Sequence, residues 1–188
     1  RGEQLCGRCA GEGMIVQRLF PTRRISVALA CLALLAACGG PSGSSLRAPS
    51  ADIDCMARAM YFESIRSSRD GMIAVGSVVM NRVESDAFPD TVCGVVRQKN
   101  QFAPGVMSKR MDSRSAPMAR AAAQAVLAGE RHPDIAQAMF FHAASYRASF
   151  NNIHYVLTTG GNAFYERRRP QNVTSPRPLP PREGINGR

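Results

Sequence analysis

Apolar side chains at helical spacing mark a first helix over residues 55–64. A repeat of three or four residues brings side chains onto one face of a helix. The side chains on that face are Met56, Ala59, Met60 and Glu63. Asp54 precedes them and is a favourable N-cap, because its carboxylate can accept from the free N–H groups of the first turn. The pattern predicts a helix with one acidic residue near the end of an apolar face.

Residues 71–83 predict a second helix that is apolar over most of its surface. Asp70 is its expected N-cap, and Asn81 and Arg82 mark its more polar end. Its apolar residues are Met72, Ile73, Val75, Val78, Val79 and Val83. A helix that is apolar on all sides is typical of a buried element. We therefore expect this helix at the centre of the core.

The elements predicted after this helix are shorter. Phe88-Pro89 interrupts the helical pattern, and Thr91 is expected to begin a short helix that ends near Val96. Residues 97–113 have the composition of a loop. A further helix is predicted over residues 115–128, where a glycine follows as the stop signal.

The last part of this region has the pattern of strands. Residues 138–142 and 152–156 are strand-like. Residues 158–162 read Thr-Thr-Gly-Gly-Asn, which is a turn sequence, and residues 163–166 can pair back as a hairpin. Helices followed by a small β element indicate an α+β fold, which we assign to a single domain over residues 52–166.

The N-terminal part of the chain has the pattern of an export signal. Residues 14–37 are expected to form a secretory signal peptide, because arginines precede an apolar run too short to span a bilayer. The run ends in Leu35-Ala36-Ala37-Cys38, which resembles the lipobox of bacterial lipoproteins, where the cysteine receives the lipid. A plain signal peptide is the alternative. Residues 38–51 would then be a flexible tether, and residues 1–13 fit as sequence upstream of the true start.

The charge of the chain fits an exported protein that meets anionic surfaces. The net charge is +10, and residues 167–188 hold six arginines and one glutamate. This Arg- and Pro-rich tail is not expected to fold. Its charge favours the cell wall or lipid head groups, whereas nucleic acid is not an expected partner outside the cytoplasm. With Gly39 after the lipidated cysteine, we expect a lipoprotein of the outer membrane that faces the periplasm.

Six cysteines are present, and their positions suggest one disulfide. Three precede the expected lipidation site: Cys6, Cys9 and Cys31. Cys38 would carry the lipid, which leaves Cys55 and Cys93 in the exported domain. Two remaining thiols in an oxidising compartment favour a disulfide, worth about 3–4 kcal/mol in the chain-entropy description. Two buried free thiols are the alternative.

Glu63 is the strongest candidate for chemistry. A carboxylic acid on an apolar helix face has its charged form destabilised by burial, which raises its pKa. Such a group can hold a proton near neutral pH and donate it, as the leaving oxygen of a glycosidic bond requires. The alternative is a glutamate at a helix end that reaches water and has no catalytic role.

The order of motifs along the domain resembles the SleB/CwlJ cell-wall hydrolase family. The resemblance covers about 110 residues in six blocks: 55–64, 70–83, 88–96, 101–102, 140–142 and 160–165. It implies a lysozyme-like domain that cleaves the glycan strands of peptidoglycan between MurNAc and GlcNAc, with Glu63 as the catalytic acid. Spore-cortex members of the family are described as lytic transglycosylases. Many members carry a second glutamate four residues after the first, where this chain has Ser67.

The missing second carboxylate favours the transglycosylase reaction. A glycosidase that uses two carboxylates needs a nucleophile or base besides the acid. In a lytic transglycosylase the C6 hydroxyl of the substrate attacks C1 instead, so a single glutamate serves as acid and then as base. The product is a 1,6-anhydro sugar, and neither a metal nor another cofactor is implied.

Further side chains are candidates for substrate contacts: Gln101, Phe102, His142, Asn162, Phe164 and Tyr165. Gln101 can bind an acetamido group, and Phe102 can stack on a sugar face. The alternative for this pair is a loop anchor with a buried ring. His142 can bind sugar hydroxyls or serve as a structural group. Phe164 and Tyr165 line either the substrate groove or the core of the hairpin.

Two other classes of function remain open from the sequence. His142, His154 and an acid could hold zinc and support an N-acetylmuramoyl-L-alanine amidase, although their spacing matches no local zinc motif. A lipoprotein that binds peptidoglycan without cleaving it is the second alternative. The sequence contains neither a phosphate-binding glycine loop nor an H-E-x-x-H motif. The family resemblance implies glycan strands as the partner, and the lipobox implies a membrane through the lipid, with the protein itself expected to be a monomer.

Overall fold

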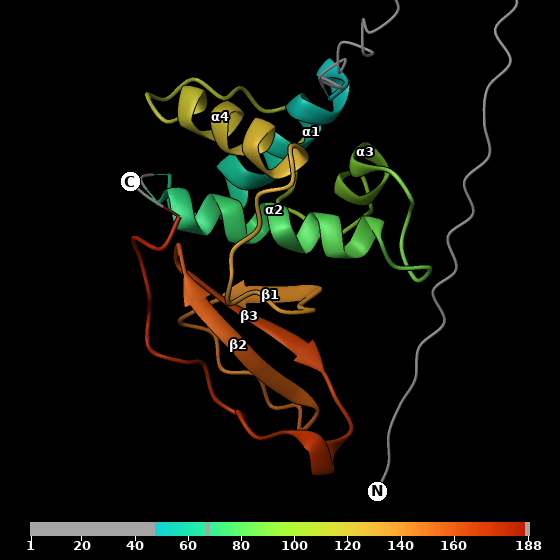
Figure 1. Cartoon of the computed structure of the whole chain (residues 1–188), viewed down its shortest axis with the longest axis vertical. Helices are drawn as coiled ribbons and strands as arrows, with labels where there is room; N and C mark the ends of the chain where they lie inside the picture. Colours follow the sequence, from blue (N-terminus) through green and yellow to red (C-terminus); the bar gives the residue numbers. More distant parts are fainter. Residues whose placement is uncertain (1–47, 67, 187–188) are drawn as a thin grey trace, which may run out of the picture. The chain divides into compact units, whose positions relative to one another are not determined.

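The computed structural model describes residues 48–66 and 68–186, which form an α+β domain (Figure 1). The predicted fold class is thereby confirmed. The helices are α1 (Ser50–Glu63), α2 (Arg69–Val83), α3 (Val92–Val96) and α4 (Ala116–Leu127). The strands are β1 (Phe140–Ala143), β2 (Ile153–Thr159) and β3 (Asn162–Arg167), followed by a short 3₁₀ helix, η1 (Pro170–Asn172). Ser67 and the expected signal peptide and lipidation site lie outside the described residues.

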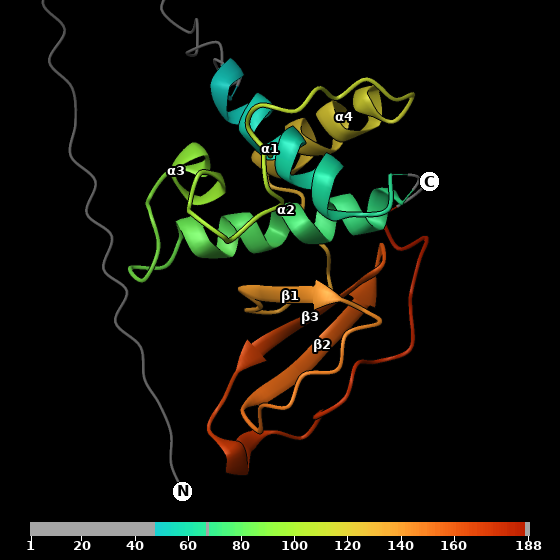
Figure 2. The same cartoon turned by 180° about the vertical axis from the view of Figure 1, so that it is seen from behind.

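Helix α2 is the centre of the domain, as its apolar sequence predicts. It lies between the other helices on one side and the sheet on the other (Figures 1 and 2). Its apolar residues Met72, Ile73, Val75, Val78 and Val79 have no exposed surface. In the part of the chain that the structure describes, no helix combines the length and apolar character needed to cross a membrane.

The beginnings of the first two helices differ from the sequence prediction. Asp54 is not an N-cap, because α1 has already begun before it; instead it forms an ion pair of 2.7 Å with Arg58 one turn later. Asp70 is not the N-cap of α2 either. Ser68 has that position, and its hydroxyl accepts from the Gly71 N–H at 2.9 Å. Several polar residues near a helix start can serve as caps, and the pattern of side chains alone does not decide among them.

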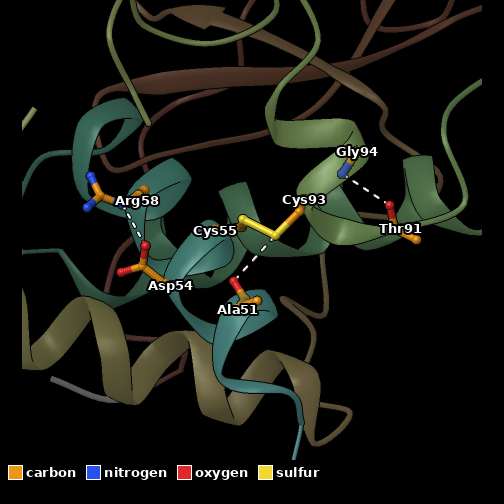
Figure 3. The surroundings of a disulfide bond; sticks show 7 residues. All are labelled: Ala51, Asp54, Cys55, Arg58, Thr91, Cys93 and Gly94. Carbon is orange, nitrogen blue, oxygen red and sulfur yellow. Dashed lines mark hydrogen bonds and ion pairs between the residues drawn. A yellow bond between two sulfur atoms is a disulfide. The ribbon is translucent and has the colours of Figure 1, made fainter. Parts of the chain in front are cut away.

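The short helix α3 and the disulfide follow the prediction. The Thr91 hydroxyl accepts from the Gly94 N–H at 3.1 Å and caps α3. Cys55 on α1 is bonded to Cys93 on α3, so the bond joins two helices (Figure 3). Because α3 has five residues, its own hydrogen bonds contribute little, and the covalent link and its buried valines hold it in place.

The three strands form an antiparallel sheet in the order β1-β3-β2. Gly160 and Gly161 make the turn between β2 and β3, with φ of +56° and +80°. This conformation suits a tight hairpin. The turn also touches the start of α2: a Cβ added at Gly160 would lie 2.3 Å from the Cα of Gly71. This contact leaves no room for a side chain and fixes the hairpin against the helices.

The two faces of the sheet have different surroundings. On one face Phe141, Phe164 and Leu157 pack into the core beneath the helices. On the other face Tyr155 belongs to a second, smaller cluster, in which Leu179 from the C-terminal segment packs against the strands. Along β3 alternation separates the two sets, with Phe164 facing the helices and Tyr165 facing the other side. Along β2 a bulge between Tyr155 and Leu157 puts these two side chains on opposite faces although they are two residues apart.

The C-terminal segment corrects our expectation of an unfolded tail from residue 167. Strand β3 continues to Arg167, and the chain then returns along the sheet (Figure 1). The Tyr155 N–H donates to Ser175 O at 2.9 Å, and the Arg182 N–H donates to Thr158 O at 2.8 Å. Composition indicates disorder because arginine and proline form little core, but it does not register backbone hydrogen bonds to a distant strand.

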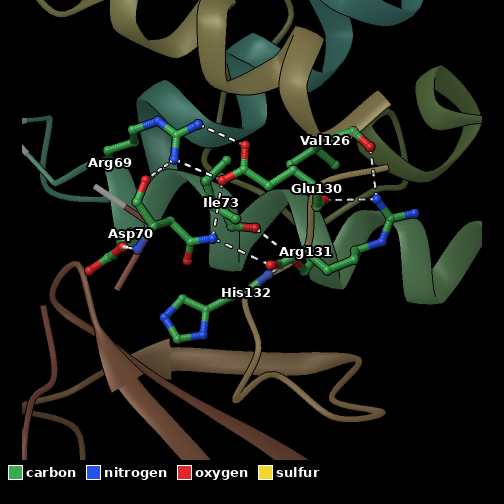
Figure 4. Close-up of polar contacts among 9 residues, drawn as sticks. Arg69, Asp70, Ile73, Val126, Glu130, Arg131 and His132 are labelled. Carbon is green, nitrogen blue, oxygen red and sulfur yellow. Dashed lines mark hydrogen bonds and ion pairs between the residues drawn. The ribbon is translucent and has the colours of Figure 1, made fainter. Parts of the chain in front are cut away.

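The same segment ends at the start of α2, where a polar cluster holds it. The Asp70 carboxylate accepts from the Ile185 N–H and the Asn186 N–H. Figure 4 shows this end of the helix, where Arg69 also forms an ion pair of 2.7 Å with Glu130. The acid that we expected to cap α2 therefore binds the C-terminal segment instead.

Candidate active site

Glu63 is the last residue of α1 and lies where the helices meet the sheet. Its side chain is half-buried, and one carboxylate oxygen accepts from the Ala103 N–H in the loop between α3 and α4. Its backbone oxygen accepts from the side-chain amide of Asn162, the first residue of β3. The helix end, the loop and the sheet thus fix the position of this carboxyl group.

The surroundings of Glu63 favour the protonated acid. Burial raises the pKa of Glu63, while the Ala103 N–H and the charge of Arg82 act in the opposite direction without cancelling the rise. The direction agrees with the expectation for a carboxyl group on an apolar helix face. A carboxyl group with a raised pKa can keep a proton at higher pH than an ordinary glutamate and can donate it to a leaving oxygen.

Arg82 lies close to this carboxyl group and is buried, although the sequence placed it at the more polar end of α2. Its exposed fraction is 3%, and its Nε donates to Met139 O at 2.8 Å. The guanidinium lies over the rings of Phe88 and Phe102, at 5.2 and 5.4 Å. Burial lowers the pKa of Arg82 to about 10, so it remains a cation at neutral pH. The sequence signal that could have indicated its burial is the position of this arginine within a helix that is apolar on all sides.

The loop residues Gln101 and Phe102 have different roles. Phe102 is 9% exposed and packs near Phe141, with ring centroids 6.5 Å apart. Phe102 therefore anchors the loop, which was the alternative to stacking on a sugar. By doing so it orders the N–H of the adjacent Ala103. Gln101 is exposed, and its role as a substrate contact stays a prediction.

A cavity of about 500 Å³ opens within the same loop. Phe102 and Ala103 belong to its lining, but Glu63 does not. The cavity therefore adjoins the loop that binds Glu63 without including the carboxyl group in its lining.

Asn162 and Phe164 were both expected to contact substrate, and the structure gives each another position. Phe164 has no exposed surface and packs against Phe141 at 5.5 Å, so the prediction of a substrate contact is wrong. It points into the core because alternate residues of β3 face the helices. Asn162 is 6% exposed, and its amide is occupied by Glu63 O, so it positions the end of α1.

His142 and Tyr165 belong to an aromatic group on the other face of the sheet. The His142 Nε2 lies 2.7 Å from the Tyr155 hydroxyl, and its Nδ1 lies 2.9 Å from Ala143 O. Because a carbonyl can only accept, Nδ1 carries a proton. The rings of Tyr146 and Tyr165 lie 5.1 and 5.5 Å from that of His142, and Tyr146 is 54% exposed. An exposed ring such as Tyr146 can stack on a sugar. His142 and Tyr165 are partly buried, and their substrate roles stay predictions.

The two histidines of the zinc alternative do not converge. His142 bonds to Tyr155, and His154, the residue before Tyr155 on β2, points to the opposite face of the sheet. The His154 Nδ1 accepts from the Thr174 N–H at 3.3 Å. Within residues 48–66 and 68–186, no three His, Cys, Asp or Glu side chains are grouped so that they could hold a metal ion.

Curated relatives resemble part of the chain. The spore cortex-lytic enzyme of Oceanobacillus iheyensis is 43% identical over 51 residues, which are 27% of this chain and 18% of that protein. The spore cortex-lytic enzyme of Bacillus cereus is 45% identical over 51 residues, or 27% of this chain and 20% of that protein. The aligned part is thus about a fifth of the length of these relatives.

A solved structure and a family description cover more of the chain. The catalytic domain of the Bacillus cereus SleB protein has a TM-score of 0.54 and 26% identity, over 68% of this chain and 99% of that domain. The sequence model of the Cell Wall Hydrolase family matches residues 66–165, beginning just after Glu63. Since this match spans more than half of the sequence, the chain belongs to the cell wall hydrolase family.

Proposed function

We propose that the protein cleaves the glycan strands of peptidoglycan as a lytic transglycosylase, with Glu63 as the single catalytic acid and base. The observation that carries the proposal is the half-buried carboxyl group at the end of α1, whose pKa burial raises. Membership of the cell wall hydrolase family supports the substrate class. The names of the relatives, spore cortex-lytic enzymes, agree with it.

In the proposed reaction Glu63 first donates its proton to the oxygen between MurNAc C1 and the next sugar. The C1–O bond breaks, and the leaving sugar departs with a free hydroxyl group. The C6 hydroxyl of MurNAc then bonds to C1, and its proton passes to the Glu63 carboxylate. The 1,6-anhydro product forms without water, and Glu63 is restored to its protonated state, which makes one residue sufficient.

The charges around Glu63 support a mechanism with one carboxylate. In two-carboxylate glycosidases the groups lie ~5–9.5 Å apart, close enough for each to raise the pKa of the other. Among the described residues, the charged side chain that affects the pKa of Glu63 is Arg82, a cation. The corresponding position four residues on, Ser67, lies outside the described residues and carries no carboxylate.

The location of the protein is a further part of the proposal. We infer export by the segment 14–37, lipidation at Cys38 and anchoring as a monomer at the periplasmic face of the outer membrane. The Cys55–Cys93 bond supports an oxidising compartment. A fatty-acid analogue should label the wild-type protein in cells and should not label Cys38→Ala. Equal labelling of both would refute lipidation at this residue.

Product analysis tests the proposed reaction. Purified protein would digest intact sacculi, and mass spectrometry would identify the released fragments. We expect muropeptides with anhydro ends, each one water lighter than a hydrolysed fragment. Peptides freed from intact glycan strands would instead indicate an amidase. Binding to sacculi with no fragments released, by folded protein, would indicate a lipoprotein that only binds the wall.

A further inference from the structure

Arg82 is a buried cation that the reaction described above does not use. It is 3% exposed, and its Nε is held by Met139 O at 2.8 Å. Its Nη1 is buried and has no hydrogen-bond partner among the described residues. Nor is Arg82 a member of any ion pair that the structure shows within those residues. The guanidinium is therefore removed from water with only part of its hydrogen-bonding capacity satisfied.

Such a group lowers the stability of a fold. A buried charge is costly unless it is paired, and an apolar side chain of similar volume often replaces it without loss of stability. Methionine would fill the same space between Phe88 and Phe102, whose rings lie 5.2 and 5.4 Å from the guanidinium carbon. Features that cost a protein stability, such as a buried unpaired charge, are expected mainly at functional sites. The position of Arg82 is consistent with that rule, because Glu63 is close by.

Arg82 contacts the loop that binds the Glu63 carboxyl group and the segment that leads into the sheet. Its guanidinium packs on Phe102, and the next residue, Ala103, donates its N–H to Glu63. Its Nε holds Met139 O, directly before β1. Arg82 on α2 therefore connects the loop and the sheet that flank the carboxyl group. Movement of this guanidinium would disturb the hydrogen bond that orients Glu63.

We propose that Arg82 is a positioning residue for Glu63: it orders the loop that binds the carboxyl group, and its charge stabilises the carboxylate that proton donation leaves behind. The proposal rests on the proposed function of Glu63 as the acid. Proton donation converts a neutral acid into a buried anion, and a fixed cation nearby makes that conversion easier. Because Arg82 is in no ion pair among the described residues, its charge is not already neutralised by another acid.

The electrostatic direction agrees with this geometry. The groups that act on the pKa of Glu63 are Arg82 from α2 and the Ala103 N–H from the loop, and both lower it against the effect of burial. In return Glu63, together with Tyr165 from β3, raises the pKa of Arg82 against its own burial. Removal of the cation should therefore raise the pKa of Glu63 further and make it a weaker acid.

The test compares Arg82→Met, Arg82→Gln and Arg82→Lys in otherwise intact protein. Arg69→Met is the matched control, because Arg69 lies at the other end of the same helix and pairs with Glu130. The readout is the pH profile of kcat/KM on sacculi, together with thermal unfolding. In Arg82→Met and Arg82→Gln we expect the decline of kcat/KM on the alkaline side, the alkaline limb of the profile, to move to higher pH. We also expect kcat to fall about 10- to 100-fold, the loss that misplacement of a catalytic group can cause. Arg82→Lys keeps the positive charge, so its alkaline limb should lie at the same pH as in the wild-type protein.

The possible outcomes distinguish an effect of the Arg82 charge on Glu63 from an effect of its packing. An alkaline limb that stays in place in both neutral variants, with kcat within about twofold of wild type, would overturn the proposal. A limb that moves equally in Arg82→Lys would show that charge is not the cause and would also overturn it. If Arg82→Met does not fold, Arg82→Gln gives the same comparison. Failure of the proposed function is distinguishable, because wild-type protein would then release no anhydro-muropeptides.

Discussion

The disulfide between α1 and α3 gives a prediction with a calculable size. Cys55 and Cys93 are 38 residues apart, and closing a loop of that length lowers the entropy of the unfolded chain by about 13 cal/mol/K. At room temperature this amounts to about 4 kcal/mol of stability. Small domains unfold with ~5–15 kcal/mol, so the bond would supply a large share of the total. Its loss should also release α3, which is too short to persist alone.

Urea unfolding of oxidised and reduced protein measures this contribution. The double variant Cys55→Ala/Cys93→Ala is the control, since a reductant should lower the unfolding free energy of wild type and leave that of the variant unchanged. We expect a loss of about 3–4 kcal/mol for the reduced wild type. A difference below ~1 kcal/mol, from protein whose disulfide is verified by peptide mapping, would refute the reasoning.

The remaining predictions concern the acid and the hairpin beside it. Glu63→Gln keeps the shape of the side chain but cannot donate a proton to the leaving oxygen. Its activity on sacculi should therefore fall ~10²–10⁴-fold while the melting temperature stays near that of wild type. A variant that retains more than about a tenth of the wild-type activity would contradict this prediction. Wild-type kcat/KM should decline on the alkaline side as Glu63 loses its proton, and the raised pKa puts that decline at higher pH than for an ordinary glutamate; a decline at the ordinary glutamate pKa would argue against Glu63 as the acid. Gly160→Ala should destabilise the domain by ~1–3 kcal/mol more than Gly129→Ala, because both glycines have positive φ but only Gly160 touches Gly71. Equal unfolding free energies for these two variants would show that the contact between Gly160 and Gly71 does not contribute to stability.

Periodicity predicted the elements that one stretch of sequence determines. The apolar repeat of α2 identified both the helix and its central position, and Gly160-Gly161 identified the turn of the hairpin. The capping residues were predicted less well. Ser68 and Asp70 are both suitable caps, and the contact of Asp70 with the returning C-terminal segment decides between them.

The candidate site was predictable where one residue has a distinctive environment in the sequence. Glu63 was identifiable as an acid on an apolar face, and the structure half-buries it. The roles of Phe164 and Asn162 depended on which face of β3 meets the helices, and an isolated strand sequence does not determine that. Arg82 was missed because a charged residue at a helix end ordinarily reaches water.

The source of the new chemical ends tests the account most directly. Sacculi would be digested in water labelled with heavy oxygen, and the released fragments would be analysed by mass spectrometry. If Glu63 directs the C6 hydroxyl to C1, the new MurNAc ends will be anhydro and will contain no heavy oxygen. Heavy oxygen at the reducing end of MurNAc would show that water attacks C1. That result would contradict a transglycosylase mechanism with one carboxylate.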